Sequence, residues 1–169
     1  MKPNTDESTK TSGLPFARGF WELIAYQKAR ALQRRAFELS KRFPREETYS
    51  LTDQMRRAAR SIGAQISEAW AKRDYEKHFV SKLSDALGEC NETQHWTLSA
   101  VDDGYLQRDD AKELWNLCLE VGRILTAMSE RSCEFCQDAT NPRVRETSPE
   151  FFCTAPLPWA DELPLSTNH

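Results

Sequence analysis

The stretch LTDQMRRAARSIGAQISEAW, residues 51–70, decides the fold of this chain, because its apolar side chains recur with the period of an α-helix. When successive residues are turned by about 100°, Met55, Ile62 and Ile66 fall on one narrow stripe. Such a stripe is typical of a helix that buries one face against neighbouring helices. The full stripe consists of Leu51, Met55, Ala58, Ile62, Ile66 and Ala69.

Two other features of this stretch lie outside the apolar stripe. Arg56, Arg57 and Arg60 form a cationic group, and small residues follow on the Arg56 side of the helix. Small side chains at four-residue spacing let a second helix approach closely. We therefore predict an oligomer interface beside a basic patch, although the same residues would also suit a surface of short side chains that faces solvent. The predicted interface consists of Gly63, Ser67 and Ala71.

Helical periodicity also extends to both sides of this stretch. Upstream, a stripe of alanine and leucine ends at Phe43-Pro44, because the residue before a proline disfavours the α conformation. Ser50 and Asp53 resemble a capping box at the start of the second helix, and Asp74 is suited to cap a third. The expected inner faces are Ala25, Ala29, Leu32, Ala36, Leu39 and Phe43 in the first helix, Phe79, Leu83, Ala86, Cys90, Thr97 and Val101 in the third, and Leu114, Leu117, Val121, Ile124 and Met128 in the fourth.

Four such helices joined by short loops predict an all-α fold, an antiparallel up-down-up-down four-helix bundle over residues 16–131. Gly104 is suited to the left-handed cap that ends the third helix, and the fourth helix is expected to end near Arg131. Residues 1–15 lack periodic apolar side chains and are predicted to be disordered, while the proline-rich residues 132–169 are predicted to form a flexible tail. The apolar residues that would let this tail dock on the bundle or on a partner are Phe151, Phe152, Leu157 and Trp159.

The composition limits the class of protein. Hydrophobic residues make up 39% of the chain and charged residues 29%, which suits helices that bury one stripe each. The net charge of −3 excludes a polybasic nucleic-acid binder, yet residues 1–73 have a balance of +7 and residues 74–169 a balance of −10. Such asymmetry suggests an electrostatic partner or self-association of unlike faces, with dispersed solubilising charge as the alternative. Neither a signal peptide nor a transmembrane segment is evident, so we expect a cytoplasmic protein.

One helical spacing resembles half of a metal site. Glu92 and His95 have the Glu-x-x-His spacing that di-iron bundles use twice. Neither His78 nor His169 follows a glutamate at that spacing, so no second motif exists. We therefore expect no metal at this position and assign His95 to the polar face of its helix.

The cysteines indicate free thiols rather than a disulfide framework. Their number is odd and no signal peptide is present, which argues against an oxidising compartment. Cys133 and Cys136 form a CxxC pair, but structural zinc usually needs a second pair and only Cys153 and the terminal His169 follow. We expect neither a metal nor any other cofactor.

The first three helices carry a recognisable pattern of residues. It consists of Phe43, Pro44, Tyr49, Leu51, Gln54, Arg56, Arg57, Ala58, Ser61 and Ile62, followed by Leu83, Ala86, Gly88 and Glu92. In this pattern the chain resembles the small four-helix-bundle proteins encoded by intervening sequences in 23S ribosomal RNA genes, a family that also includes accessory proteins of diversity-generating retroelements. The similarity covers about residues 16–130. Where the family has Asn-Ile-Ala-Glu-Gly, this chain has Gln65, Ile66, Ser67, Glu68 and Ala69.

This resemblance implies a homopentamer without known catalytic activity and, for the retroelement members, contact with a reverse transcriptase and nucleic acid. We therefore predict a non-enzymatic oligomeric scaffold that binds DNA, RNA or a nucleic-acid enzyme through basic surface. The alternative is a structural or protein–protein interaction module with no nucleic-acid role, in which the arginines pair with carboxylates of residues 74–169. Glu68, near Arg57 on the wheel, is expected to find its cation on another helix or subunit. The predicted basic residues are Arg30, Arg34, Arg35, Arg56, Arg57 and Arg60.

Overall fold

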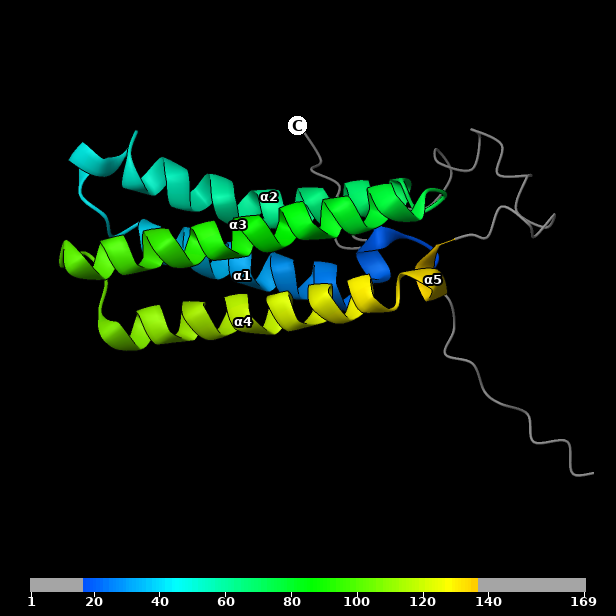
Figure 1. Ribbon diagram of the computed structural model, residues 1–169. Helices are drawn as coiled ribbons and strands as arrows, with labels where there is room; N and C mark the ends of the chain where they lie inside the picture. The colour runs from blue at the N-terminus through cyan, green and yellow to red at the C-terminus, as the bar shows by residue number, and fades with distance from the viewer. Residues whose placement is uncertain (1–16, 137–169) are drawn as a thin grey trace, which may run out of the picture.

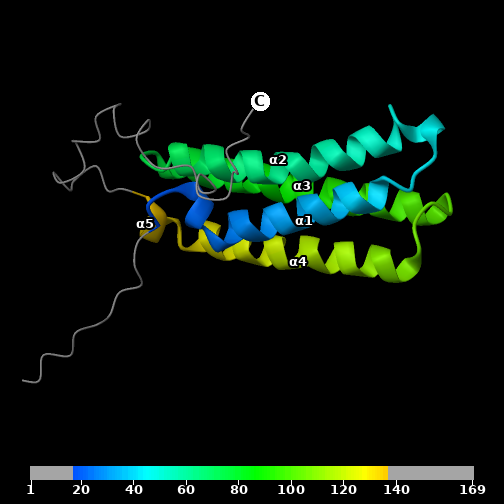
Figure 2. The ribbon, with the colours of Figure 1, turned by 180° about the vertical axis from the view of Figure 1, so that it is seen from behind.

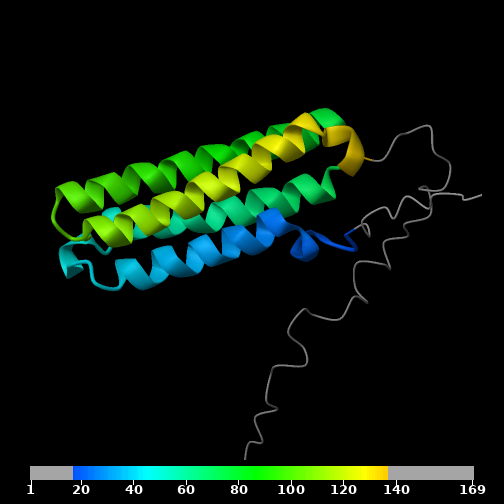
Figure 3. The ribbon, with the colours of Figure 1, turned by 90° about the horizontal axis from the view of Figure 1, so that it is seen from below.

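The fold is an antiparallel four-helix bundle. The computed structural model describes residues 17–136, and no strand occurs in that range. Helix α1 lies beside α2 and α4, and α3 completes the square from the opposite side (Figures 1 and 2). Seen from below, the four helices run nearly parallel along their whole length (Figure 3). The elements are η1 (Phe20–Glu22), α1 (Ile24–Ser40), η2 (Arg45–Glu47), α2 (Leu51–Ala71), α3 (Glu76–Asp102), α4 (Arg108–Glu130) and α5 (Ser132–Phe135).

The buried stripes follow the predicted period closely in the first two helices. All the predicted inner residues of α1 and α2 are buried, and α2 also buries Ala59 and Gly63. In α3 the stripe passes through Ala100, while the predicted Val101 is only half-buried. In α4 it passes through Cys118 and Leu125 rather than their predicted neighbours Leu117 and Ile124, which are half-buried.

The helix ends confirm one predicted cap and correct two others. Gly104 has a φ of 76°, so the left-handed turn after α3 forms where a glycine tolerates it. The predicted Ser50–Asp53 capping box does not form. Instead, the carboxylate of Glu47 accepts the backbone N–H of Leu51 at 3.2 Å and the Ser50 hydroxyl, and these two hydrogen bonds lower the pKa of Glu47. Asp74 does not cap α3, which begins two residues later with no side-chain cap.

The ordered structure extends past the predicted end of the bundle at Arg131. Helix α5 turns back against α3 and α4. Its Ser132 hydroxyl hydrogen-bonds to the carboxylate of Glu76, and the ring of Phe135 stacks on Phe79 with centroids 5.8 Å apart. The bundle therefore includes residues 132–136, and the remaining predicted tail and the predicted disordered N-terminal segment lie outside the described residues.

We expect Phe135→Ala to lower the free energy of unfolding by about 1–3 kcal/mol, because it removes a half-buried ring from the end of the core. Cys133→Ala, an exposed position on the same short helix, is the matched control and should change stability by less than about 0.5 kcal/mol. Urea unfolding followed by circular dichroism measures both. Equal stability of the two variants would show that the core ends at Arg131.

Candidate nucleic-acid interface

The contact between α1 and α2 fixes the relative positions of their side chains. Near one end of the contact, Gly63 lies under the ring of Tyr26, and a Cβ built on this glycine would be 3.5 Å from the ring. Near the other end, the Arg56 guanidinium donates a 2.8 Å hydrogen bond from Nε to the hydroxyl of the buried Ser40. In this antiparallel register, Arg60 lies one turn from Arg56 in the direction of Tyr26.

A basic surface forms along this contact around the half-buried ring of Phe37. The Arg56 guanidinium carbon and the Lys41 ammonium nitrogen each lie 4.8 Å from the centre of that ring. Arg34 precedes Phe37 by one helical turn and Arg60 follows Arg56 by one turn, so both continue the same side of the contact; both are exposed. We call Arg34, Lys41, Arg56 and Arg60 the basic surface.

The charges of this surface are only partly compensated. Lys41 pairs with Glu38 of its own helix at 2.9 Å, and the Arg56 hydrogen bond to Ser40 involves a neutral group. No carboxylate within residues 17–136 lies within 4.0 Å of the Arg34 or Arg60 guanidinium. The surface therefore presents two arginines whose charge is available to an anion.

Two of the six predicted arginines face elsewhere. Arg35 turns toward α4, where its guanidinium lies 2.6 Å from both Asp110 and Glu113. Arg57 belongs to the α2–α3 side, where its charge opposes the raised pKa of Glu89 that burial and Glu92 produce. The predicted trios therefore do not form two patches: Arg35 pairs with carboxylates of α4, and the exposed Arg57 lies on the α2–α3 side of the subunit.

The remaining members of the surface could have been found from the sequence. Arg30, Arg34, Phe37 and Lys41 are spaced by four, three and four residues, which is one stripe of a helix. The prediction overlooked Phe37 and Lys41 because it considered arginines alone. Arg30 is exposed one turn before Arg34.

Of the three residues predicted to form an interface between subunits, Gly63 is buried within the subunit beneath the Tyr26 ring. The side of α2 that carries Gly63 faces α1. Each helix of a four-helix bundle contacts two neighbours, so it buries more than its central apolar stripe. Ala71 is exposed and Ser67 is half-buried, with its hydroxyl donating to the carbonyl of Ala64. Both remain a predicted interface.

The ion pair predicted for Glu68 is confirmed, and its cation is Lys82 of α3. The Lys82 ammonium lies 2.9 Å from Glu68 and 3.3 Å from Asp85, and it donates to the side-chain carbonyl of Gln65 at 3.0 Å. Hydrogen bonds to the two carboxylates raise the pKa of Lys82. This cluster links α2 to α3 and leaves Lys82 fully occupied within the subunit.

The Glu92–His95 and Cys133–Cys136 spacings resemble parts of metal sites, but their side chains make other contacts in the structure. Glu92 accepts a hydrogen bond from the indole of Trp96 at 3.1 Å, and His95 packs its ring against the same indole. Cys133 is exposed and Cys136 half-buried, with a pKa raised by burial and by Glu76. Within residues 17–136, His, Cys, Asp and Glu side chains form no group of three that could hold a metal ion.

The described part of the chain also contains no helix that is long and apolar enough to cross a membrane.

Comparison with known proteins identifies a family and a similar solved structure. The profile of the family described as 23S rRNA-intervening sequence protein matches residues 21–127, which is more than half of the chain. Among solved structures, the chain is similar to a protein of unknown function from the S23 ribosomal protein family of Bacteroides thetaiotaomicron, with 27% identity and a TM-score of 0.58. That match covers 63% of this chain and 96% of the other. No curated protein matches.

We expect Gly63→Leu to lower the free energy of unfolding of the subunit by about 1–3 kcal/mol, because the added side chain must displace the Tyr26 ring. Ala64→Leu, on the exposed neighbouring position, is the matched control and should leave stability within about 0.5 kcal/mol. Thermal and urea unfolding compare the two. An effect of Gly63→Leu on oligomer size without any loss of stability would place this glycine back at an interface between subunits.

Proposed function

Because the chain belongs to the 23S rRNA-intervening sequence protein family, we propose that it is a non-enzymatic, oligomeric helical scaffold whose basic surface binds nucleic acid. The observation that carries this proposal is the pair of exposed arginines, Arg34 and Arg60. They continue the surface on which the side chains of Lys41 and Arg56 lie against the Phe37 ring. Arginine offers a planar set of donors that matches phosphate oxygens. A surface of this kind recognises the nucleic-acid backbone rather than a base sequence.

The geometry favours phosphate binding over a purely structural role for these arginines. Arg35 of α1 and Arg42 of the turn that follows it already neutralise Asp110, so α1 does not need Arg34 to join it to α4. The Phe37 ring and the Ser40 hydroxyl hold Arg56 in place, which reduces the conformational entropy that the side chain loses on binding. One small basic surface gives weak binding, but repetition around an oligomer multiplies the local field.

An oligomer is also supported by a glycine that the subunit does not need. Gly88 lies inside the 27-residue helix α3, where a glycine costs about 1 kcal/mol relative to alanine. Nothing lies within 4 Å of a Cβ built at this position, whereas Gly63 and Gly122 each face a side chain of the same subunit. Gly88 therefore allows close approach from outside, and we propose that another subunit packs there, in a homopentamer with predicted interface residues Ser67 and Ala71.

Within the family, we propose that the chain acts as an accessory protein in the cytoplasm and that the basic surface brings nucleic acid to an enzyme such as a reverse transcriptase. The chain and the enzyme could be joined in two ways: both could bind the same nucleic-acid molecule, or they could contact each other directly. Co-purification with and without nuclease treatment distinguishes these routes, since only a direct contact survives removal of the nucleic acid.

The second candidate function is a protein–protein interaction module without a nucleic-acid role. The observation that favours it is the neutralisation of Arg35 and Arg42 by α4 carboxylates, which uses up part of the positive charge of the first half of the chain. On this view the charge asymmetry of the sequence serves contacts between helices. Replacement of Arg34 and Arg60 decides between the two functions.

We expect the chain to bind a fluorescein-labelled RNA or duplex DNA at 50 mM salt, with affinity that falls steeply toward about 0.2 M. The double variant Arg34→Gln/Arg60→Gln should weaken binding of every sequence and reduce the salt slope by about one for each phosphate that is no longer bound. Arg108→Gln/Lys112→Gln, which removes two exposed charges from α4, is the matched control and should bind nearly as well as the unaltered chain. Fluorescence anisotropy measures each affinity. Equal weakening by both pairs, or no binding at 50 mM salt, would leave only the interaction-module function.

We expect light scattering of the full chain at micromolar concentration to give about five times the subunit mass of 19.5 kDa. Gly88→Leu should reduce this mass without loss of helicity, because the added side chain occupies the space that the neighbouring subunit needs. Lys112→Leu, which adds a leucine to an exposed position of α4, should leave it unchanged. A monomeric parent chain, or a Gly88→Leu variant of unaltered size, would contradict the proposed assembly.

A further inference from the structure

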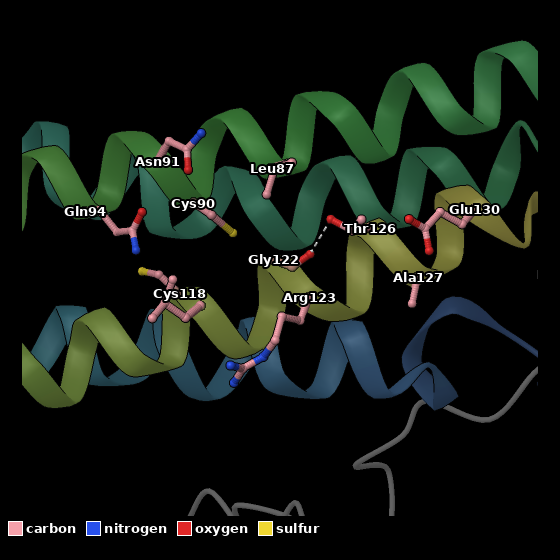
Figure 4. Close-up of a pocket in the computed structure, with 11 residues that line it drawn as sticks. Leu87, Cys90, Asn91, Gln94, Cys118, Gly122, Arg123, Thr126, Ala127 and Glu130 are labelled. Carbon is pink, nitrogen blue, oxygen red and sulfur yellow. Dashed lines mark hydrogen bonds between the residues drawn. The ribbon is translucent and has the colours of Figure 1, made fainter.

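A shallow apolar groove lies between α3 and α4 on the face of the bundle that the basic surface does not use. Its volume is about 350 Å³, within the range of sites that hold small ligands or inserted side chains. Figure 4 shows Leu87 and Cys90 of α3 and Cys118 and Gly122 of α4 along its floor. Gly122 lets the helices approach, since a Cβ there would be 3.2 Å from the Leu87 side chain. Small residues around this close approach leave the groove unfilled.

The groove has an apolar end and a charged end. Leu119, at the apolar end, is 43% exposed. Arg123 and Glu130 lie on the side nearer the end of α4, and both are exposed. Neither forms an ion pair with any residue in the range 17–136. The groove therefore offers an apolar floor, then a cation, then an anion, in that order toward α5.

We propose that the segment Arg145–Cys153 of the same chain docks in this groove, with Phe151 and Phe152 on the apolar floor. The described structure ends at Cys136, directly after α5 and at the Glu130 end of the groove. The 15 residues from there to Phe151 can span about 50 Å when extended, whereas Glu130 and Leu119 are separated by about 17 Å along their helix. The length of the connection is ample.

The order of charges along the segment matches the order along the groove. A chain that enters at the Glu130 end brings Arg145 to Glu130 first and Glu150 toward Arg123 next. The two phenylalanines then reach the floor beside Leu119. Burial of an aromatic ring on apolar surface supplies the binding energy, and the two opposite-charge pairs select the direction and register of the segment.

Alkylation of the native Cys153 tests the docking in the full chain, because this thiol directly follows Phe152. Iodoacetamide reacts with thiolates, and burial raises the pKa of Cys90 and Cys118 to about 12, so these two floor thiols react slowly. The exposed Cys133 provides an internal reference. Peptide mass spectrometry should show Cys153 reacting at least ten times more slowly than Cys133 in the native protein and at a similar rate in urea.

Substitutions in the groove then test whether the groove is what protects Cys153 from alkylation. Leu119→Glu should raise the Cys153 rate to that of Cys133, while Leu98→Glu, on an α3 leucine of similar exposure outside the groove lining, should leave it slow. Arg123→Glu should also raise the rate, and adding Glu150→Arg to the same chain should restore protection. Circular dichroism confirms that each variant keeps its helices.

Three results would overturn the proposal. The first is a native Cys153 that reacts as fast as Cys133, which would show that the segment is undocked. The second is protection that survives Leu119→Glu, which would place the segment elsewhere. The third is protection that falls on dilution, which would assign the groove to a segment or surface of a second copy.

Discussion

The contact between α1 and α2 sets the register on which the surface chemistry of this bundle depends. Alanines line the facing sides of both helices, and Gly63 lies under the Tyr26 ring, where a long side chain would have to displace the ring. Because the helices lie close together, the Arg56 guanidinium reaches across to Ser40 and rests on Phe37. The position of the basic surface is thus a consequence of core packing, since any shift of one helix along the other would separate these groups.

Helix α1 divides the positive charge of the chain between two uses. On one side Arg35, together with Arg42 of the turn after the helix, pairs with Asp110 of α4, so this charge holds the two helices together. On the other side Arg34 points to solvent and extends the surface around Phe37. A chain with a net charge of −3 can therefore present a positive field on one face, because the excess carboxylates are concentrated in its second half.

Periodicity was enough to predict the bundle and the buried residues of its first two helices, because an apolar stripe repeats with the period of the helix. The prediction grouped Arg34 with Arg35, whose side chains point about 100° apart, because it considered arginines alone and not their places on the helical wheel. Periodicity could not show that the Gly63 flank is covered, since a stripe identifies the central direction of burial but not which flank the second neighbour occupies. The prediction also placed Val101 on the buried stripe of α3, where the structure buries Ala100 instead. Over 27 residues, small departures from the ideal helical period accumulate.

The buried threonines of α3 and the buried cysteines of α3 and α4 serve the fold of the subunit. The buried hydroxyls of Thr93 and Thr97 donate to carbonyls one turn earlier in α3. Burial keeps the thiols of Cys90 and Cys118 protonated, so they behave as small apolar side chains that shape the groove floor. The exposed arginines Arg34 and Arg60 and the apolar groove between α3 and α4 lie on different faces of the bundle. These two surfaces differ in chemistry, so nucleic acid on the proposed basic surface would not compete with the chain segment that we propose for the groove.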